Sequence, residues 1–198
     1  MPKKNKKQNA LSSKDLEAIN AIYEKSQKLE FPATGGQHEV TFLNGDDLFE
    51  KENPELLQQM RTLIETTDKM NWNLMKEFLE NKEEVNVRVI EYHHYRVGGG
   101  LLEKTHFDGG SIITAVFMLS DPSKDFEGGQ LMSWEANEQF LTYSVKQGSA
   151  LIFPSHKYHS VSTVTKGERN VLVIELWSGE KGTEKHRTGA FGYLIPNY

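Results

Sequence analysis

The chain contains no cysteine among its 198 residues. Disulfides, thiolate metal sites and a cysteine nucleophile are therefore excluded, and any bound metal must be held by nitrogen and oxygen. The sequence also lacks an apolar run approaching the roughly 20 residues needed to span a bilayer. Its basic first residues are not followed by the apolar run of a secretory signal. These absences predict a cytoplasmic protein without a membrane partner, and they leave a nuclear location open.

The chain is acidic overall, although its first residues are basic. The formal net charge is −5 and the sequence pI is about 5.8, whereas a dedicated nucleic-acid binder usually presents a basic face to the phosphates. We therefore expect no nucleic-acid partner. Residues 1–11 are predicted to form a disordered basic tail, because short polar termini are usually poorly ordered. Residues 12–198 are enough for one domain with a sizeable core.

The first part of this domain, about residues 12–82, is predicted to be helical support. One helix begins at Ser12 or Ser13, either of which can cap it, and runs to about Lys28. A second helix begins at Pro54, a favoured first residue, and runs to about Asn81. Two stretches inside the second helix can divide it into shorter pieces: Thr66-Thr67 and Asn71-Trp72-Asn73.

The second part, about residues 85–198, changes to short runs rich in Val, Ile, Thr and aromatic residues. The runs are residues 85–96, 112–119, 130–134, 140–145, 150–153, 160–164 and 170–177. Many short strands separated by Gly and polar residues are typical of a sandwich or barrel. Helices first and strands afterwards favour an α+β layout. The predicted fold class is α+β, mainly β: a double-stranded β-helix, or jelly roll, supported by the N-terminal helices.

The most specific chemical pattern is a histidine and an aspartate two positions apart in His106-Phe107-Asp108. Alternate residues of a strand project to the same side, so we expect His106 and Asp108 to point together. The pair alone is a weak signal, because short motifs often match by chance. His159, at the start of a later apolar run, would complete a set of two imidazoles and one carboxylate. Such a set caps one face of iron(II), and nitrogen and oxygen ligands also accept Mn(II), Co(II) or Zn(II).

Three other histidines are rival ligands: His93, His94 and His156. His156 is the most serious, since it lies three residues before His159. We prefer His159 because of its spacing from Arg169, whose planar guanidinium matches a carboxylate bidentately. If Thr165 to Gly167 form a three-residue hairpin loop, Arg169 pairs with Thr163 and shares the inward face of His159.

Six motifs between about Val87 and Trp177 together match one family. They are Tyr95-Arg96-Val97-Gly98, His106-Phe107-Asp108, Phe126-Glu127-Gly128-Gly129, Phe153-Pro154, His159-Ser160-Val161 and Gly167-Glu168-Arg169. In these motifs the chain resembles the iron(II)- and 2-oxoglutarate-dependent dioxygenases, and within them the prolyl 4-hydroxylase-like branch.

The resemblance assigns roles to particular residues. It implies that His106, Asp108 and His159 hold iron. It also implies that Arg169 pairs with the distal carboxylate of 2-oxoglutarate and that Tyr95 lies near the same co-substrate. Tyr92 also can face inward, so whether Tyr92 or Tyr95 makes the contact stays open at this point.

The resemblance further implies an enzyme that hydroxylates a substrate C–H bond with O₂ as second co-substrate and with succinate and CO₂ as co-products. It implies ascorbate as a helper that keeps the iron reduced. The implied substrate is a peptidyl proline. A small molecule or another protein side chain is the alternative, so the expected partner is a protein, a peptide or a small-molecule substrate.

The chain departs from related proteins at three positions. Members of this branch often carry Lys where Arg169 stands and Tyr where Met118 stands. Nucleic-acid demethylases of the wider superfamily usually carry a second Arg where this chain has Glu175, which counts against nucleic acid as substrate.

Two other classes remain as alternatives to the oxygenase. A cupin-like metal protein without 2-oxoglutarate would not need Arg169. A non-catalytic jelly-roll metal-binding module could keep the fold without turnover, and the intact set of three metal ligands argues against it.

Overall fold

The protein is described by a computed structural model that covers residues 5–29, 36–135 and 139–182. Its helices are α1 (Ser13–Lys28), the short 3₁₀ helix η1 (Gly45–Asp47), α2 (Leu48–Glu52), α3 (Pro54–Asn71) and α4 (Lys76–Glu80). Its strands are β1 (Asn5–Lys7), β2 (His38–Phe42), β3 (Asn86–Tyr95), β4 (Ile113–Met118), β5 (Phe126–Gly128), β6 (Leu131–Trp134), β7 (Phe140–Tyr143), β8 (Ala150–Pro154), β9 (His159–Val161), β10 (Val164–Gly167) and β11 (Arg169–Trp177).

Both predicted helices are present, and their ends follow from capping. Ser12 caps α1: its hydroxyl accepts from the backbone N–H of Asp15, and the Asp15 carboxylate accepts from the backbone N–H of Ser12. This reciprocal pair satisfies two donors that a helix N-terminus otherwise leaves open. Asn53 caps α3 through its side-chain oxygen alone, which accepts from the backbone N–H of Leu56, and Pro54 occupies the first turn. The expected helix starts are therefore confirmed.

The second predicted helix is two helices, as its polar interruption indicated. The Asp68 carboxylate accepts from the backbone N–H groups of Leu74 and Met75 at 2.9 and 3.0 Å. These bonds replace the helical ones, and Asn73 turns the chain with a positive φ of 55°. The helix therefore ends at Asn71 and resumes as α4.

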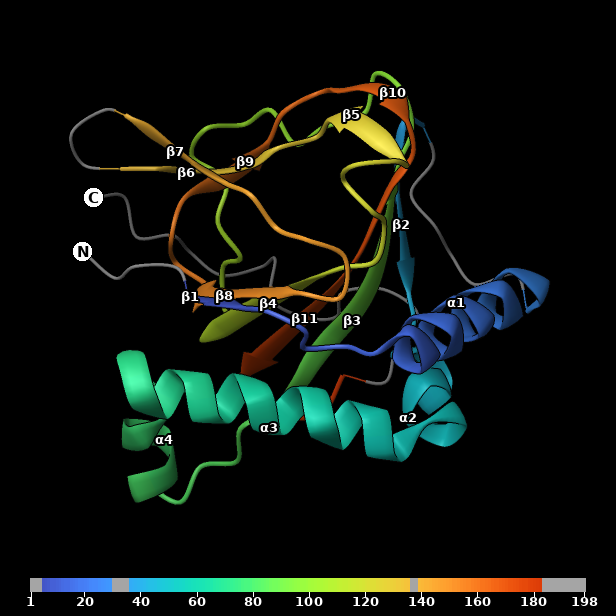
Figure 1. The fold of residues 1–198 in the computed structure, drawn as a ribbon. Helices are drawn as coiled ribbons and strands as arrows, with labels where there is room; N and C mark the ends of the chain where they lie inside the picture. The colour runs from blue at the N-terminus through green and yellow to red at the C-terminus, as the bar shows by residue number, and fades with distance from the viewer. Residues whose placement is uncertain (1–4, 30–35, 136–138, 183–198) are drawn as a thin grey trace.

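The strands form a jelly-roll core of antiparallel pairs (Figure 1). The larger sheet has the order β1-β8-β4-β11-β3-β2, and β7-β6-β9 and β10-β5 form two smaller sheets. In Figure 1 the smaller sheets lie above the larger one, α3 lies below it, and α1 and α2 lie to its right and lower right. The predicted fold class is confirmed.

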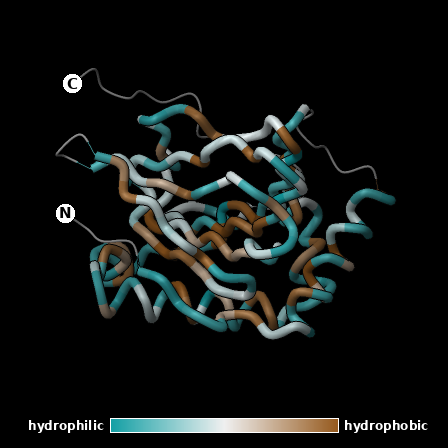
Figure 2. The backbone as a smooth tube through the Cα atoms, turned by 45° about the horizontal axis from the view of Figure 1, so that its top comes forward, coloured by the Kyte–Doolittle hydropathy of each residue, from teal (hydrophilic) through white to brown (hydrophobic). Residues whose placement is uncertain are grey.

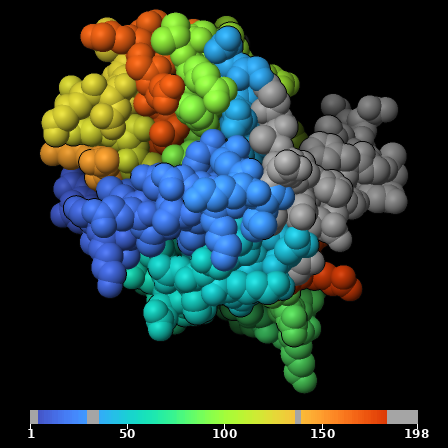
Figure 3. All heavy atoms as spheres, turned by 90° about the vertical axis from the view of Figure 1, so that its right-hand side faces the viewer, coloured from blue at the N-terminus to red at the C-terminus, as the bar shows by residue number. Residues whose placement is uncertain are grey.

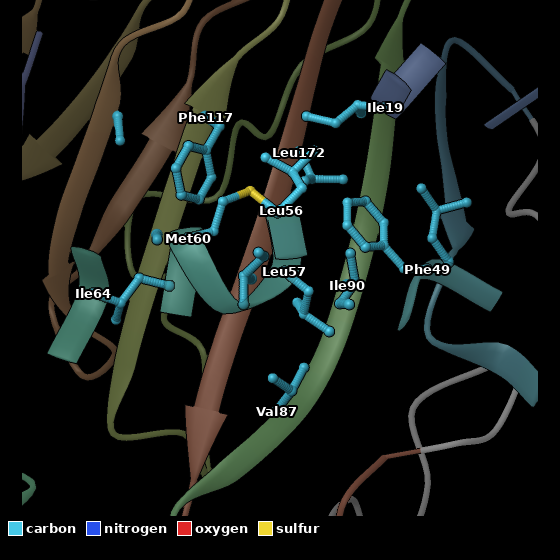
Figure 4. Packing of buried hydrophobic residues seen from close by; sticks show 14 of the residues in the cluster. Ile19, Phe49, Leu56, Leu57, Met60, Ile64, Val87, Ile90, Phe117 and Leu172 are labelled. Atoms are coloured by element: carbon cyan, nitrogen blue, oxygen red, sulfur yellow. The ribbon is translucent and has the colours of Figure 1, made fainter. Parts of the chain in front are cut away.

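Central strands of the larger sheet are buried on both faces. Along β11, Leu172 and Ile174 belong to the core between the helices and the larger sheet. Val171 and Val173 belong to the core between the larger and smaller sheets. This double burial explains the continuous apolar runs of the sequence. In Figure 2 the hydrophobic segments gather in the interior, and Figure 4 shows side chains of α3 packed against β3, β4 and β11.

The helices close the outer face of the larger sheet. Leu56, Met60 and Ile64 recur at helical spacing on α3 and are at most 3% exposed, so they present one apolar stripe to the sheet. Figure 3 shows α1 lying between β2 and the α2–α3 region on one side of the molecule. The opposite face of the larger sheet, which the helices do not cover, is the face available to the functional site.

Four strands were not predicted from the sequence: β1, β2, β5 and β10. The first of them also corrects the expected tail. Residues 5–7 form β1, an edge strand paired with β8, so the expected disordered tail of residues 1–11 is wrong in this part. Leu11 is 5% exposed and its N–H donates to Gly148, which holds the segment against the sheet. Residues 1–4 lie outside the described residues. Within the described part of the chain, no helix is long and apolar enough to cross a membrane.

Candidate metal centre

Three predicted ligands meet at one point of the structure. One ligand atom from each of His106, Asp108 and His159 lies within 4.8 Å of the others. The carboxylate oxygens of Asp108 lie 3.4 Å from His106 Nε2 and 3.8 Å from His159 Nε2. Two ligands at right angles on a metal about 2.1 Å away lie about 3 Å apart. The donor set and its spacing therefore fit a divalent ion with only a small contraction.

The segment that carries His106 and Asp108 is a loop, and the expectation that it is a strand is wrong. Its backbone is nevertheless fixed at both residues. The N–H of His159 donates to the carbonyl of His106 at 2.9 Å, and the N–H of Asp108 donates to the carbonyl of Ser155 at 3.0 Å. The loop therefore pairs with the chain that leads into β9, which brings the distant third ligand beside the first two.

The Asp108 carboxylate is oriented by two hydroxyl groups that the sequence did not indicate. Thr114 on β4 donates to Asp108 Oδ2 at 2.6 Å, and Thr114 and Ser155 share a hydrogen bond of 2.9 Å. Thr114 is 1% exposed and Asp108 is 6% exposed. Hydrogen bonds of this kind fix a metal-binding carboxylate and tune its affinity.

Replacing Thr114 with Val should weaken metal binding about 10- to 100-fold, the usual effect of removing a group that orients a ligand. The substitution keeps the shape of the side chain and removes the donor to Asp108. Titration of the metal against a chelator would measure the change. Ser123→Ala, which removes an exposed hydroxyl that donates to Asp121 rather than to Asp108, is the control, and equal affinities for both variants would contradict the assigned role.

The ring of His159 is held so that one nitrogen faces Asp108. His159 Nδ1 lies 3.0 Å from the backbone carbonyl of Lys157. Because a carbonyl oxygen only accepts, Nδ1 must carry the hydrogen, and the lone pair is on Nε2. The Lys157 side chain is itself buried and paired with Glu135 at 2.8 Å.

The rival histidines are placed elsewhere. His156 is exposed, and His94 pairs with Glu168 at 3.1 Å. His93 contacts Glu91 and His38. Within the described residues, three or more groups able to hold a metal cluster only around His159, with His106 and Asp108.

Arg169 lies inward at the first position of β11 and is 1% exposed. The local hairpin expected for it is wrong: β10 pairs with β5, and Arg169 is opposite Tyr95 on β3. The inward orientation is therefore set by β3 rather than by a turn. A Cβ on Gly129 would lie 2.7 Å from Arg169 Cδ, so this glycine leaves the space that the long side chain occupies.

The guanidinium of Arg169 is buried without a hydrogen-bond acceptor. Its Nε and both terminal nitrogens have no hydrogen-bond partner among the described residues. The Tyr95 ring lies 4.9 Å from its Cζ, a cation–π contact that offsets only part of the lost hydration. Burial lowers the pKa of Arg169, and burial raises the pKa of Tyr95 to about 12. A buried fork of donors without a protein acceptor fits a carboxylate ligand.

The sequence did not indicate the polar cluster beside Tyr95. His38 on β2 contacts His93, and His93 contacts Glu91, each at 2.9 Å. The parity of β3 could have indicated His93, because it lies two positions before Tyr95. His38 gave no signal, since no strand was expected around it.

The environment of His38 makes stability depend on pH. Burial, followed by the neighbouring His93 and Arg169, lowers the pKa of His38 from 6.5 to about 3, while Glu91 opposes this shift. The unfolded chain then binds more protons between these values, so the free energy of unfolding rises as pH increases from about 3 to 6.5.

We expect His38→Gln to flatten this rise by at most about 1.4 kcal/mol per pH unit, the limit for one proton. Solvent reaching the half-buried ring makes the change in slope smaller than this limit. Denaturant unfolding of wild type and His38→Gln between pH 4 and 7 measures how the free energy of unfolding depends on pH. Parallel curves for the two proteins would contradict the lowered pKa.

The turn after Asp108 is anchored by a buried ion pair. Arg88 lies 3.6 Å from Glu175, and it donates to the carbonyl of Gly109 and to Ser111 at 2.6 and 2.9 Å. Ser111 in turn donates to Glu175 at 2.6 Å. Glu175, the position noted as a departure from the demethylases, therefore helps to hold the loop that carries Asp108.

Comparisons with known proteins agree with this geometry. The family model described as the 2OG-Fe(II) oxygenase superfamily matches residues 90–178. This range contains the three predicted metal ligands and Arg169. A PKHD-type hydroxylase of Gloeothece citriformis is 30% identical over 172 residues, covering 82% of this chain and 73% of that protein.

Two solved structures share the fold. A Trichoplax adhaerens prolyl hydroxylase, in complex with a hypoxia inducible factor peptide fragment, has a TM-score of 0.65 at 14% identity, covering 90% of this chain and 84% of that one. A Pseudomonas putida prolyl-4-hydroxylase has a TM-score of 0.61 at 14% identity, covering 89% and 93%. At these identities the likeness concerns the fold alone.

Proposed function

We propose, since this chain belongs to the 2OG-Fe(II) oxygenase superfamily, that its iron(II) is held by His106, Asp108 and His159. We also propose that Arg169 and Tyr95 bind the distal end of 2-oxoglutarate. The chain is an oxidoreductase of the dioxygenase class, and iron(II) and 2-oxoglutarate are the cofactor and co-substrate that its family implies. We also propose a single domain, with helical support in about residues 12–82 and the jelly-roll core from about residue 85, and a cytoplasmic location.

The observation that carries the site assignment is the unpartnered guanidinium of Arg169. A buried charge without hydrogen bonds destabilises a fold, and proteins rarely keep one without a use. Arg169 is opposite Tyr95, which shares the core between the sheets with Phe153, and the Phe153 ring contacts His159. The guanidinium offers donors that a planar carboxylate can accept in pairs. A cupin-like metal protein without 2-oxoglutarate has no need for this arrangement.

Iron(II) with bound 2-oxoglutarate and O₂ supplies the chemistry that hydroxylates an unactivated C–H bond. The protein contributes orientation and shielding. Thr114 fixes the carboxylate of Asp108, and the Lys157 carbonyl fixes the tautomer of His159. Arg169 neutralises the distal carboxylate in a region where apolar side chains exclude water; these include Met118, Leu151, Phe153, Val171 and Val173.

We further propose a peptidyl proline as the substrate, hydroxylated as in prolyl 4-hydroxylases. The names of the relatives and the peptide held by the Trichoplax adhaerens neighbour support this choice. Exposed side chains beside the metal ligands also support a chain-like substrate. Tyr158 and Phe140 are 42% and 38% exposed, and Lys104 lies over the rings of Trp134 and Phe140.

A small-molecule substrate or another protein side chain is the second candidate, because the metal ligands and Arg169 serve any substrate equally. We propose ascorbate as the reductant that restores iron(II), from the family resemblance alone.

The test is formation of succinate from 2-oxoglutarate by protein loaded with iron(II) without air and then exposed to O₂. Wild type should produce succinate in an iron-dependent way, and His159→Ala should lose the activity. His156→Ala, which removes an exposed imidazole three residues away, is the matched control and should keep it. Proline-containing peptides should accelerate succinate formation and gain one oxygen atom, detectable as a mass increase.

Failure of wild type to bind either iron or 2-oxoglutarate would overturn the assignment of the site. Binding with acceleration only by small molecules would retain the site and replace the proposed substrate.

A further inference from the structure

Three side chains on adjacent strands lie at one level of the larger sheet. Tyr95 on β3 is opposite Arg169 on β11 and opposite His38 on β2. β3 is hydrogen-bonded to both of these strands, and directly opposite residues project to the same face. Tyr95 is therefore placed between the imidazole and the guanidinium.

The three groups are stacked. The rings of His38 and Tyr95 are 3.9 Å apart and 14° from parallel, and Arg169 Cζ lies 4.9 Å from the centroid of the Tyr95 ring. The described residues offer the Arg169 guanidinium no acceptor in good hydrogen-bond geometry, and Tyr95 is the neighbour that opposes the lowering of the Arg169 pKa by burial. The orientation of the guanidinium therefore depends on Tyr95 and on the space left by Gly129.

A chain of hydrogen bonds fixes the outer member of this stack. An ionised Glu91 only accepts, so His93 Nε2 carries the hydrogen that it donates over 2.9 Å. His93 Nδ1 then accepts, and His38 Nε2 donates to it over 2.9 Å. The Tyr95 hydroxyl also lies 3.3 Å from His93 Nδ1. One histidine thus ties both stacked rings to a buried carboxylate.

We propose that His38 is a positioning residue for 2-oxoglutarate: anchored through His93 to Glu91, it holds the Tyr95 ring against Arg169 and so aims the guanidinium at the distal carboxylate. This inference rests on the proposed role of Arg169. Apolar side chains at these positions would stabilise this part of the sheet with a smaller desolvation cost, because every member of a buried polar network needs a hydrogen-bond partner. The polar cluster is therefore expected to serve the ligand rather than the fold.

Three substitutions of His38 separate the effect of its stacked ring from the effect of its hydrogen bond. His38→Phe keeps an aromatic ring and loses the hydrogen bond, His38→Gln keeps a hydrogen-bonding group and loses the ring, and His38→Ala loses both. His94→Ala is the matched control, because His94 lies on the same strand as Tyr95 and pairs outward with Glu168.

Calorimetric titration of the Mn(II)-loaded, oxygen-free proteins measures the affinity for 2-oxoglutarate. The comparison ligand is 2-oxopentanoate, which has the same five carbons without the distal carboxylate. We expect Ala and Gln to weaken 2-oxoglutarate about 3- to 10-fold, the range of one aromatic pair, with Phe recovering part of the loss. Affinity for 2-oxopentanoate and for Mn(II) should stay within about 2-fold for all variants on the same reasoning.

Equal losses for both ligands would mean a general structural role and would overturn the proposal, as would unchanged 2-oxoglutarate affinity in Ala and Gln. If His38→Ala fails to fold, the Gln and Phe variants decide. Failure of wild type to prefer 2-oxoglutarate over 2-oxopentanoate would instead overturn the role of Arg169, which separates this result from a failure at His38 alone.

Discussion

Replacing Arg169 with Met should produce a protein that folds more stably without co-substrate and binds 2-oxoglutarate at least about 100-fold more weakly. The loss follows from the two charge-assisted hydrogen bonds that the guanidinium would give the distal carboxylate, each contributing about 1.5–3 kcal/mol. The gain in stability follows from removing a buried charge whose nitrogens have no partner in the described structure. Apolar replacements of buried charges stabilise by up to about 4 kcal/mol.

Two measurements on the same variant test these opposite effects. Denaturant unfolding without ligand should show a higher free energy of unfolding than wild type, and calorimetric titration should show the lost affinity. Arg169→Lys is the control, since it keeps the charge but not the planar fork, and it should lose less affinity than Met. Wild-type affinity for 2-oxoglutarate in the Met variant would refute the assigned contact, whatever happens to stability.

The sequence predicted the parts of the fold that depend on local chemistry. The starts of α1 and α3 follow from Ser12 and Asn53 as caps, and the central strands follow from continuous apolar runs. Short edge elements such as β1 and β2 were missed, because their stability comes from backbone pairing with strands far along the chain. Such pairing leaves almost no trace in composition.

The site was predicted in its residues but not in its geometry. His106 and Asp108 were expected to point together from a strand, whereas a loop held by His159 and Ser155 brings them together. Arg169 was expected to face inward through a hairpin, whereas its pairing with Tyr95 turns it inward. In both cases the residue types carried the correct chemistry, and long-range backbone pairing, which a sequence does not display, supplied the placement.

The residues that support the ligands were the hardest to predict. Thr114 and His38 act through single hydrogen bonds or one stacked ring, and threonine and histidine occur in strands for many reasons. Only the three-dimensional contact distinguishes a group that orients a ligand from one that fills space.

Replacing Asp108 with Asn should weaken iron(II) binding by more than about 100-fold, beyond the effect of losing a supporting group. The amide has the same shape and can still accept from the Thr114 hydroxyl, so the apo fold should persist. What disappears is the negative charge between two imidazoles at 3.4 and 3.8 Å. A neutral amide competes poorly with water for a divalent ion, and succinate formation should be lost with the metal.

Competition with a chelator measures this affinity, and Glu103→Gln is the matched control because it removes an exposed carboxylate from the same loop. Undiminished iron binding in Asp108→Asn would place the metal elsewhere.

Comparing the loss of iron(II) affinity in Asp108→Asn with the loss in Thr114→Val shows whether charge or orientation matters more. Thr114→Val leaves the charge and disturbs its orientation, whereas Asp108→Asn leaves the orientation and removes the charge. A larger loss in Asp108→Asn means that charge dominates binding at this centre, and similar losses mean that the carboxylate binds iron(II) only when Thr114 holds it in place.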